Sequence, residues 1–264
     1  MIANSSVVDV RVDTPSATIV LNRPARKNAL SSESVERLQQ VFDDLLRDRK
    51  VAAVILTGAS DAFCSGADLK EMEAHLEEEG AQEKWFQQTM ALNELIVTML
   101  RFPKPIIAAV NGPALGCGFA LALACDAILA SPSAHFGCPE VERGLVPGLV
   151  TPLLAFRVGA SKAARYALSG VRLDGNAAVE AGICHEKVSG DHLLWARAQE
   201  WATDYSANSP QALQMTKQLI NETIGEQFLT HLSLGTANTA AARTTDSAKE
   251  GVRAFLSKRK PDWK

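Results

Sequence analysis

Two short stretches of small residues could take part in chemistry in this chain. Ser65-Gly66-Ala67-Asp68 and Gly116-Cys117-Gly118 each precede a predicted helix. Small residues leave backbone N–H groups uncovered, and the start of a helix carries partial positive charge. Such donors suit a site where negative charge develops on an oxygen atom. Taken alone, each stretch is explained at least as well by ordinary structure, either close packing in the core or a loop in which Asp68 caps a helix.

Glu140 is the candidate for proton transfer. It follows the segment FGCP at residues 136–139, and an apolar setting raises the pKa of a carboxyl group towards neutrality. The alternative is an exposed carboxylate at the start of a helix. Glu142 lies nearby, but an exposed position is favoured for it.

The elements that must position these groups centre on residues 104–140. No charged residue occurs between residues 106 and 125, although 22% of the chain is charged. Residues 105–110 predict a short buried strand, Asn111-Gly112-Pro113 predicts a turn, and residues 119–124 continue a helix. The turn and the glycines argue against a membrane span.

Composition indicates a globular protein with a large core. The chain has 264 residues, of which 47% are hydrophobic, and its formal net charge is −3. This balance predicts no general attraction to nucleic acid or to anionic membranes. One large α/β domain with a smaller helical appendage is favoured over two equal domains.

The cysteines and histidines predict neither a disulfide framework nor a metal site. The five cysteines are scattered without a CxxC pair, and the five histidines are isolated. The first residues lack the order of a signal peptide. We therefore expect a cytoplasmic protein with no metal. The cysteines are Cys64, Cys117, Cys125, Cys138 and Cys184.

The segments before the central stretch predict alternating strands and helices, which indicates α/β layering. Alternation and apolar runs predict strands, and apolar residues at helical spacing predict helices. A serine, Ser31 or Ser32, is expected to cap the first helix. The predicted strands are 7–12, 17–22 and 51–57, and the predicted helices start at 31 or 32 and span 71–79 and 85–102.

The segments after the central stretch predict further helices. Residues 161–169 and 247–258 are predicted helices, another helix starts at Asp174, and residues 183–188 are a predicted strand. Two basic segments, residues 23–28 and 258–260, could meet phosphates or could be solvated surface.

Five segments, read together, resemble the crotonase, or enoyl-CoA hydratase/isomerase, superfamily. They are NRPARKNALS, AFCSGADLKEM, KPIIAAVNGPALGCGFALALACD, AHFGCPEVERGLVPG and EGVRAFLSKRKPDW, and they occur in the family's order. The resemblance covers the chain from about Val7 to the C-terminus. It implies an α/β fold built as a ββα spiral, with a helical C-terminal region.

The resemblance also implies the partners of the chain. The substrate class would be acyl-CoA thioesters, with CoA arriving as part of the substrate and no separate cofactor. Residues 1–200 would form the spiral core with the CoA thioester site, and residues 201–264 a helical trimerisation region. A homotrimer, or a hexamer made of two trimers, is expected.

The resemblance assigns roles to individual residues. The backbone N–H groups of Ala67 and Cys117 would form an oxyanion hole for an enolate, and Glu140 would be the catalytic carboxylate. The Cys117 thiol is expected to be a small packing group. CoA and the rest of the substrate would contact Arg26, Lys27, Ala67, Asp68, Leu69, Lys70, Phe255 and Lys258.

One departure from the family pattern leaves the reaction open. Hydratases of this family usually have two glutamates, and the first maps to Ala120. Hydration of an enoyl-CoA is narrowly favoured. A single glutamate also suits a Δ3,Δ2-enoyl-CoA isomerase or an acyl-CoA decarboxylase. A catalytically silent CoA binder and an RNA-binding or scaffold role are the further alternatives.

Overall fold

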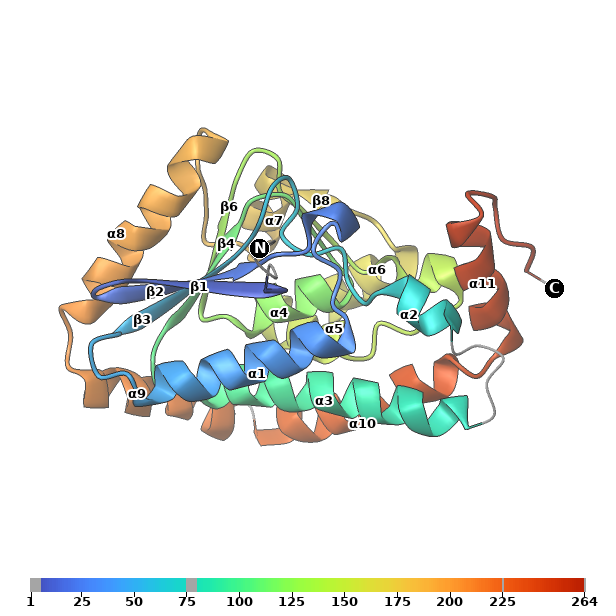
Figure 1. Cartoon of the computed structure of the whole chain (residues 1–264), viewed down its shortest axis with the longest axis horizontal. Helices are drawn as coiled ribbons and strands as arrows, with labels where there is room; N and C mark the ends of the chain where they lie inside the picture. The colour runs from blue at the N-terminus through green and yellow to red at the C-terminus, as the bar shows by residue number, and fades with distance from the viewer. Residues whose placement is uncertain (1–5, 75–79, 225, 264) are drawn as a thin grey trace, which may run out of the picture.

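Two sheets with helices packed around them form the described part of the chain (Figure 1). The computed structural model describes residues 6–74, 80–224 and 226–263. The predicted N-terminal hairpin is present as an antiparallel pair, and from its second strand onward the larger sheet is parallel. The order of that six-stranded sheet is β1 (Val8–Asp13), β2 (Ser16–Leu21), β3 (Ala53–Gly58), β4 (Ile106–Val110), β6 (Ala127–Ala130) and β9 (Glu186–Lys187).

The central strands are apolar on both faces because both faces are covered. In β3, Val54 and Leu56 face the main core, whereas Ala53 and Ile55 face a second cluster that includes residues of α8 (Leu194–Ser206). Side chains of a strand alternate between faces, so a strand covered on both sides needs a continuous apolar run. The run at residues 51–57 is therefore read correctly as a buried strand.

A second, three-stranded sheet makes the spiral. It has the order β5 (Pro113–Leu115), β7 (His135–Gly137) and β8 (Leu173–Asp174). The consecutive strands β4 and β5 belong to different sheets, as do β6 and β7, and β5 leads into α4 (Cys117–Ala124). This is the ββα spiral that the sequence analysis expects. Pro113 is not only a turn residue, because it begins β5.

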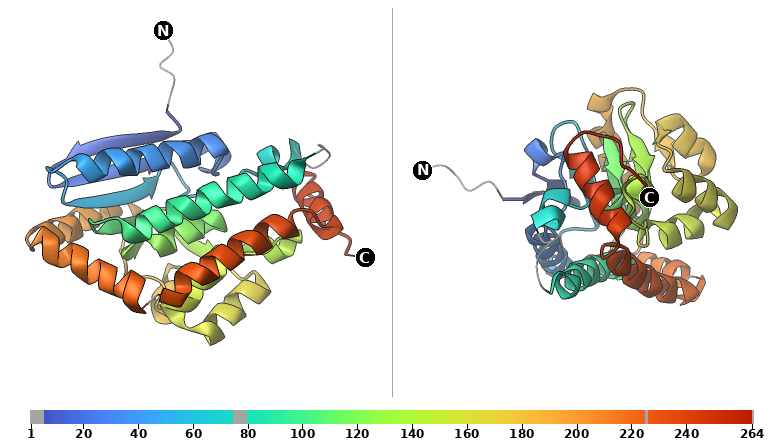
Figure 2. Two further views of the ribbon diagram at one scale, coloured as in Figure 1. Left: turned by 90° about the horizontal axis from the view of Figure 1, so that it is seen from below. Right: turned by 90° about the vertical axis from the view of Figure 1, so that its right-hand side faces the viewer.

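Three long helices lie side by side beneath the larger sheet (Figures 1 and 2). The side chain of Ser31 accepts a hydrogen bond from the backbone N–H of Ser34, so Ser31 is the predicted cap of the first helix. The second long helix begins four residues earlier than predicted. These helices are α1 (Ser32–Arg47), α3 (Ala81–Arg101) and α10 (Glu226–Ala242).

The predicted strand over residues 183–188 is wrong for its first half, since only Glu186–Lys187 forms β9. The preceding helix α7 (Gly175–Ala181) ends at Gly182 with a positive φ. The N–H groups of Ile183 and Cys184 then both donate to the carbonyl of Ala178. Backbone donors that close a helix end in this way are not available to a sheet.

The remaining helices follow the predictions closely. The predicted helices 161–169 and 247–258 are α6 (Ala160–Ser169) and α11 (Asp246–Leu256), and Asp174 caps α7. The acidic helix predicted at 71–79 is present as α2 (Leu69–Ala74), and its residues 75–79 lie outside the described residues. The others are α5 (Val150–Val158) and α9 (Pro210–Gln218), with a π-helical turn at Leu219–Ile224.

Helix α8 spans residue 200, where the sequence analysis divides core from C-terminal region. That division stays a prediction. In the described part of the chain, no helix combines the length and apolar character that crossing a membrane requires.

Candidate active site

A cavity of about 330 Å³, here called the main cavity, lies where four segments meet. These are the loop before α2, the first turn of α4, the 3-10 helix η2 (Pro139–Arg143) and helix α11. Helix α11 packs against α2 and η2 of its own chain, so the C-terminal helix forms part of the wall. Ala67, Cys117, Glu140 and Phe255 all line this cavity.

Backbone hydrogen bonds hold the loop that carries Ala67 without using the N–H group of Ala67. Leu30 and Ala67 form a parallel bridge in which the N–H of Leu30 donates to Gly66 and the N–H of Asp68 donates to Leu30. In a parallel bridge the residue between those two bonds turns its own N–H to the other side. Gly66 has a φ of 104°, and a Cβ there would lie 3.7 Å from the backbone nitrogen of Cys117.

The first turn of α4 approaches the same loop. A Cβ at Gly118 would lie 2.3 Å from the carbonyl oxygen of Cys64, so only glycine permits this contact. The positive φ required at the turn falls on Gly116, at 53°, and Cys117 is the first residue of the helix. A non-glycine residue in the middle of the glycine stretch is therefore compatible with the backbone.

The backbone amides of Ala67 and Cys117 both influence the pKa of the Cys117 thiol. Burial raises the pKa of the Cys117 thiol to about 12, and the Glu140 carboxylate adds to this effect. Hydrogen bonds from the backbone N–H groups of Ala67 and of Cys117 itself act in the opposite direction on that pKa. Both N–H groups thus lie near the Cys117 sulfur, and the thiol is neutral at physiological pH.

Glu140 lies directly against the glycine turn. A Cβ at Gly116 would lie 2.8 Å from Oε1 of Glu140. The other oxygen, Oε2, is shielded from solvent and has no hydrogen-bond partner among the described residues. Burial raises the pKa of Glu140 to about 7, against smaller lowering effects of its own backbone N–H and of the Arg143 charge. Such a carboxyl group can both take and give a proton at neutral pH.

The position where a further glutamate is expected holds Ala120, whose side chain cannot transfer a proton. Ala120 is 0% exposed, belongs to the main core cluster and does not line the main cavity. Glu142 is exposed and pairs with Arg172 at 2.7 Å. Within the described part of the main cavity wall, Glu140 and Asp68 are the carboxylates.

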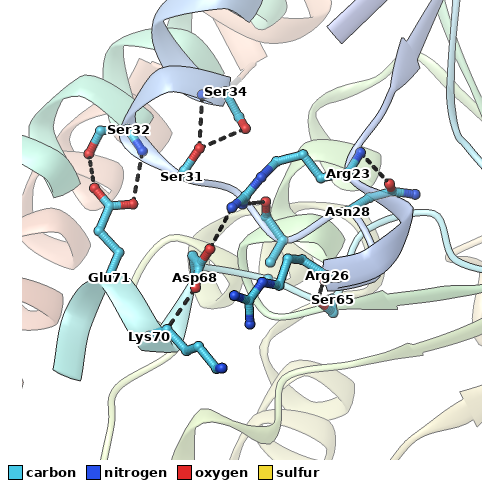
Figure 3. A network of polar contacts seen from close by, with 12 residues as sticks. Arg23, Arg26, Asn28, Ser31, Ser32, Ser34, Ser65, Asp68, Lys70 and Glu71 are labelled. Atoms are coloured by element: carbon cyan, nitrogen blue, oxygen red, sulfur yellow. Dashed lines mark hydrogen bonds and ion pairs between the residues drawn. The ribbon is translucent and has the colours of Figure 1, made fainter. Parts of the chain in front are cut away.

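Asp68 is held by Arg23. The two form an ion pair at 2.8 Å, drawn in Figure 3, and Asp68 also accepts from the backbone N–H of Lys70. The pKa of Asp68 is lowered: burial opposes this, but the hydrogen bond and charge of Arg23 outweigh it. Asp68 therefore positions the loop at Ala67 and stays ionised.

Basic residues mark the open end of the main cavity. Arg26, Lys27 and Lys70 line it and are exposed. Lys27 is paired with Asp61 at 2.5 Å, which sequence analysis could not foresee. The charged ends of Arg26 and Lys70 have no carboxylate partner in the described chain, and in Figure 3 the dashed lines at these residues reach only their backbone atoms. Leu69 also lines the cavity.

Of the two C-terminal residues expected to contact CoA, Phe255 lines the main cavity and Lys258 does not. Phe255 lines the main cavity, is 49% exposed, and carries the guanidinium of Arg143 at 4.2 Å from its ring centroid. Lys258 follows the end of α11 and is not one of the residues that line the cavity.

Two arginines of the main cavity, Arg143 and Arg243, are not among the residues predicted from the sequence. Arg143 lies in one of the quoted segments, three residues after Glu140. Arg243 follows α10, on the face shared by Gly235 and Thr239 at intervals of four residues. The four-residue spacing of Gly235, Thr239 and Arg243 is the sequence signal that could have placed Arg243 at the cavity, because residues four apart share a helix face.

No group of three or more His, Cys, Asp or Glu side chains that could hold a metal ion occurs among the described residues. All five cysteines are free thiols.

Comparisons with known proteins all point in one direction. Residues 14–264 match the family model described as enoyl-CoA hydratase/isomerase. A putative enoyl-CoA hydratase of Thermus thermophilus is 36% identical over 245 residues, which are 93% of this chain and 96% of that protein. A putative enoyl-CoA hydratase/isomerase of Bacillus subtilis is 36% identical over 252 residues, 94% of each chain. A crystal structure of an enoyl-CoA hydratase from Mycobacterium avium has a TM-score of 0.86, at 30% identity over 98% of this chain and 99% of that one.

Proposed function

Since the chain belongs to the enoyl-CoA hydratase/isomerase family, we propose that it adds water across the C2=C3 double bond of a 2-enoyl-CoA thioester. The observation that carries the proposal is the position of Glu140. Its shielded carboxyl group, with a pKa raised to about 7, lies against the turn that presents the Cys117 N–H.

The steps balance with a single carboxylate. The oxygen of water attacks C3 while Glu140 takes its proton, and the electron pair of the double bond moves towards the thioester oxygen. The N–H groups of Ala67 and Cys117 stabilise the enolate oxygen that forms. Protonated Glu140 then delivers its proton to C2, which leaves a hydroxyl group on C3. Loss of one such donor in other enzymes costs about 10²–10³ in rate.

CoA binding is proposed at the open end of the main cavity. The free charges of Arg26 and Lys70 suit phosphate groups, and Lys27 could exchange Asp61 for a phosphate. The backbone of residues 67–70 is proposed to hold the adenine end, and Phe255 to cover the CoA. Lys258 stays a predicted phosphate contact from outside the cavity wall. The reaction as written needs no cofactor beyond the CoA of the substrate.

The proposal extends to assembly and location. Exposed apolar side chains on α9, the π-helical turn and α10 suit contacts in a homotrimer, or in a hexamer of two trimers. The free thiols suit a reducing cytoplasm.

Isomerisation is the second candidate, favoured by one observation. Ala120 is buried in the core, so no second carboxylate occupies the position expected for a two-glutamate hydratase. One carboxylate suffices to move a proton between two carbons of an enolate. The two reactions differ in mass balance, because isomerisation leaves the thioester mass unchanged.

Incubation with a panel of 2-enoyl- and 3-enoyl-CoA thioesters, followed by mass spectrometry, tests the proposal. Hydration adds one water to the 2-enoyl-CoA. Glu140→Gln is expected to lower turnover about 10²-fold or more, the scale of a general acid–base group. Glu142→Gln, at an exposed glutamate outside the cavity wall, is the matched control and should stay within a few-fold. Full turnover in Glu140→Gln would disprove this assignment.

A further inference from the structure

Arg243 is a buried cation without an ion-pair partner among the described residues. It is 6% exposed, and its Nε atom is fully shielded and unpartnered among the described residues. Its Nη1 atom donates a hydrogen bond of 3.3 Å to Oε1 of Gln88. A buried guanidinium normally has a carboxylate or several acceptors around it, because removing the charge from water is costly.

Glu71, a carboxylate whose charge acts on Arg243, already has other hydrogen-bond partners. Glu71 accepts from the backbone N–H of Ser32 at 3.1 Å and from its hydroxyl at 2.5 Å, as Figure 3 shows. Gln88 also donates to Glu71 at 3.1 Å and stands between this carboxylate and Arg243. Glu71 therefore influences Arg243 only at a distance, and the Nε edge of the guanidinium stays free for another acceptor.

Arg243 lies at the inner side of the reaction site. It lines the main cavity together with Cys117 and Glu140, and it also lines a second cavity of about 360 Å³ that Ala67 lines too. The basic residues at the mouth are exposed, whereas Arg243 is buried. A thioester whose CoA lies at the mouth and whose carbonyl oxygen meets Ala67 and Cys117 must extend its acyl chain inward, towards Arg243.

Part of the cavity wall is apolar. Leu145, Pro147, Leu149 and Val150 line the main cavity, and Gly148 in the same segment packs against Gly235 and Thr239 of α10. An acyl chain would therefore cross an apolar stretch and end beside an unpaired guanidinium.

We propose that the substrate is an enoyl-CoA whose acyl chain carries a carboxylate at its far end, and that Arg243 binds that carboxylate. This inference rests on the proposed function for its site and deepens it by naming the acyl class. Arg143 also has an unpartnered Nε, but its Nη1 donates to the carbonyl of Pro139 and its guanidinium covers Phe255 at the outer wall.

The preference for a carboxylate is expected because the charge of Arg243 is already dehydrated in the free enzyme. Folding has removed Arg243 from water in the free enzyme, so an incoming carboxylate meets a positioned donor and supplies the missing charge. A chain that ends in a methyl group leaves the guanidinium unpaired. Hydrogen bonds to charged groups are strong enough to make a difference of about 10- to 100-fold between the two.

The test uses pairs of 2-enoyl-CoA thioesters of equal chain length that end in a methyl group or in a carboxylate. The wild-type enzyme should prefer the carboxylate member of at least one pair by about 10-fold or more in kcat/KM. Arg243→Met should abolish or reverse this preference, measured as the ratio of kcat/KM for the two members of a pair within the same variant. Arg47→Met, at an exposed arginine of α1 outside both cavities, should keep the wild-type preference.

A binding measurement separates failure of this inference from failure of the proposed function. Saturated acyl-CoA thioesters of the same two classes are titrated into the wild-type protein, which needs neither turnover nor a folded variant. Tighter binding of the carboxylate class supports the role of Arg243 even if no substrate is hydrated. Equal binding of both classes at every chain length overturns it, even if the methyl-ended substrates are hydrated well.

Discussion

At the scale of single residues, the ionisation of Glu140 decides when the enzyme can begin its reaction. Burial raises its pKa from 4.5 to about 7, so the carboxyl group is mostly protonated at pH 6 and mostly ionised at pH 8. Taking a proton from water requires the ionised form. A raised carboxyl pKa thus moves the rise in activity up the pH scale.

We therefore expect kcat/KM to rise between pH 6 and pH 8 with a midpoint near 7, and to level off above it. Arg143→Met should move the midpoint upward, because the Arg143 charge lowers the pKa of Glu140. Arg172→Met, at an exposed arginine, is the control. A midpoint near 4.5, the ordinary glutamate value, would show that Glu140 is not shielded as described.

Cys117 contributes a backbone N–H, and its thiol should be dispensable. The pKa of the thiol is about 12, so almost none of it is thiolate at pH 8. Cys117→Gly is expected to keep turnover within about tenfold, because the N–H is unchanged and removal of an oxyanion donor costs far more. Steady-state kinetics of the variant test this. A loss of 10²-fold or more would assign chemistry to the sulfur.

At the scale of elements, helix α11 closes the site through contacts that only glycine allows. A Cβ at Gly251 would lie 2.2 Å from the carbonyl oxygen of Arg143. In an ordinary helix, Gly→Ala stabilises by about 0.5–1 kcal/mol. At position 251 an added Cβ must push α11 away from the backbone of Arg143, so Gly→Ala should destabilise the protein here.

Gly251→Ala is expected to lower the free energy of unfolding by about 1–3 kcal/mol, the cost of overpacking, and to weaken binding of CoA thioesters. Ser247→Ala, at an exposed side chain of the same helix, should do neither. Denaturant unfolding and titration with a saturated acyl-CoA measure the two effects. Stabilisation by Gly251→Ala would show that α11 does not pack as described.

The mouth of the main cavity should bind CoA through charge. Arg26→Ala and Lys70→Ala are expected to weaken CoA binding and to reduce its salt dependence, because their charges are unpaired and exposed. Lys27→Ala should have a smaller effect, since Asp61 holds Lys27 in the free protein. Titrations at low and high salt test this order. Affinity that does not vary with salt would contradict phosphate binding here.

At the scale of the whole molecule, large apolar side chains are exposed on α9, on the π-helical turn and on α10, and exposed apolar surface is typical of protein interfaces. Met215, Leu219 and Leu234 are 69%, 55% and 60% exposed. We expect light scattering to give three or six times the mass of the chain. Met215→Glu should shift the protein to smaller species, whereas Val12→Glu, on the edge strand β1, should not. A wild-type monomer at micromolar concentration would contradict the proposal.

Much of the fold could be predicted because its signals are local. The Ser31 cap lies within three residues of its partner, and the apolar run at 51–57 needs only strand alternation to be recognised as buried. The strand at 183–188 was overestimated because the bonds that close α7 involve the carbonyl of Ala178, several residues earlier. Apolar character alone cannot show where a backbone donor goes.

By itself, the sequence determined the type of fold, the family and the residue types of the site, because five short segments carry that information in order. The tertiary structure decided what those residues can do. The loop at Ala67 and the first turn of α4 meet only because Gly66 and Gly118 permit close backbone contacts, and Glu140 is shielded only where η2 meets that turn. Arg243 reaches the same cavity from a helix about a hundred residues later. Burial and charge pairing depend on contacts between distant segments, and no local pattern of residues records them.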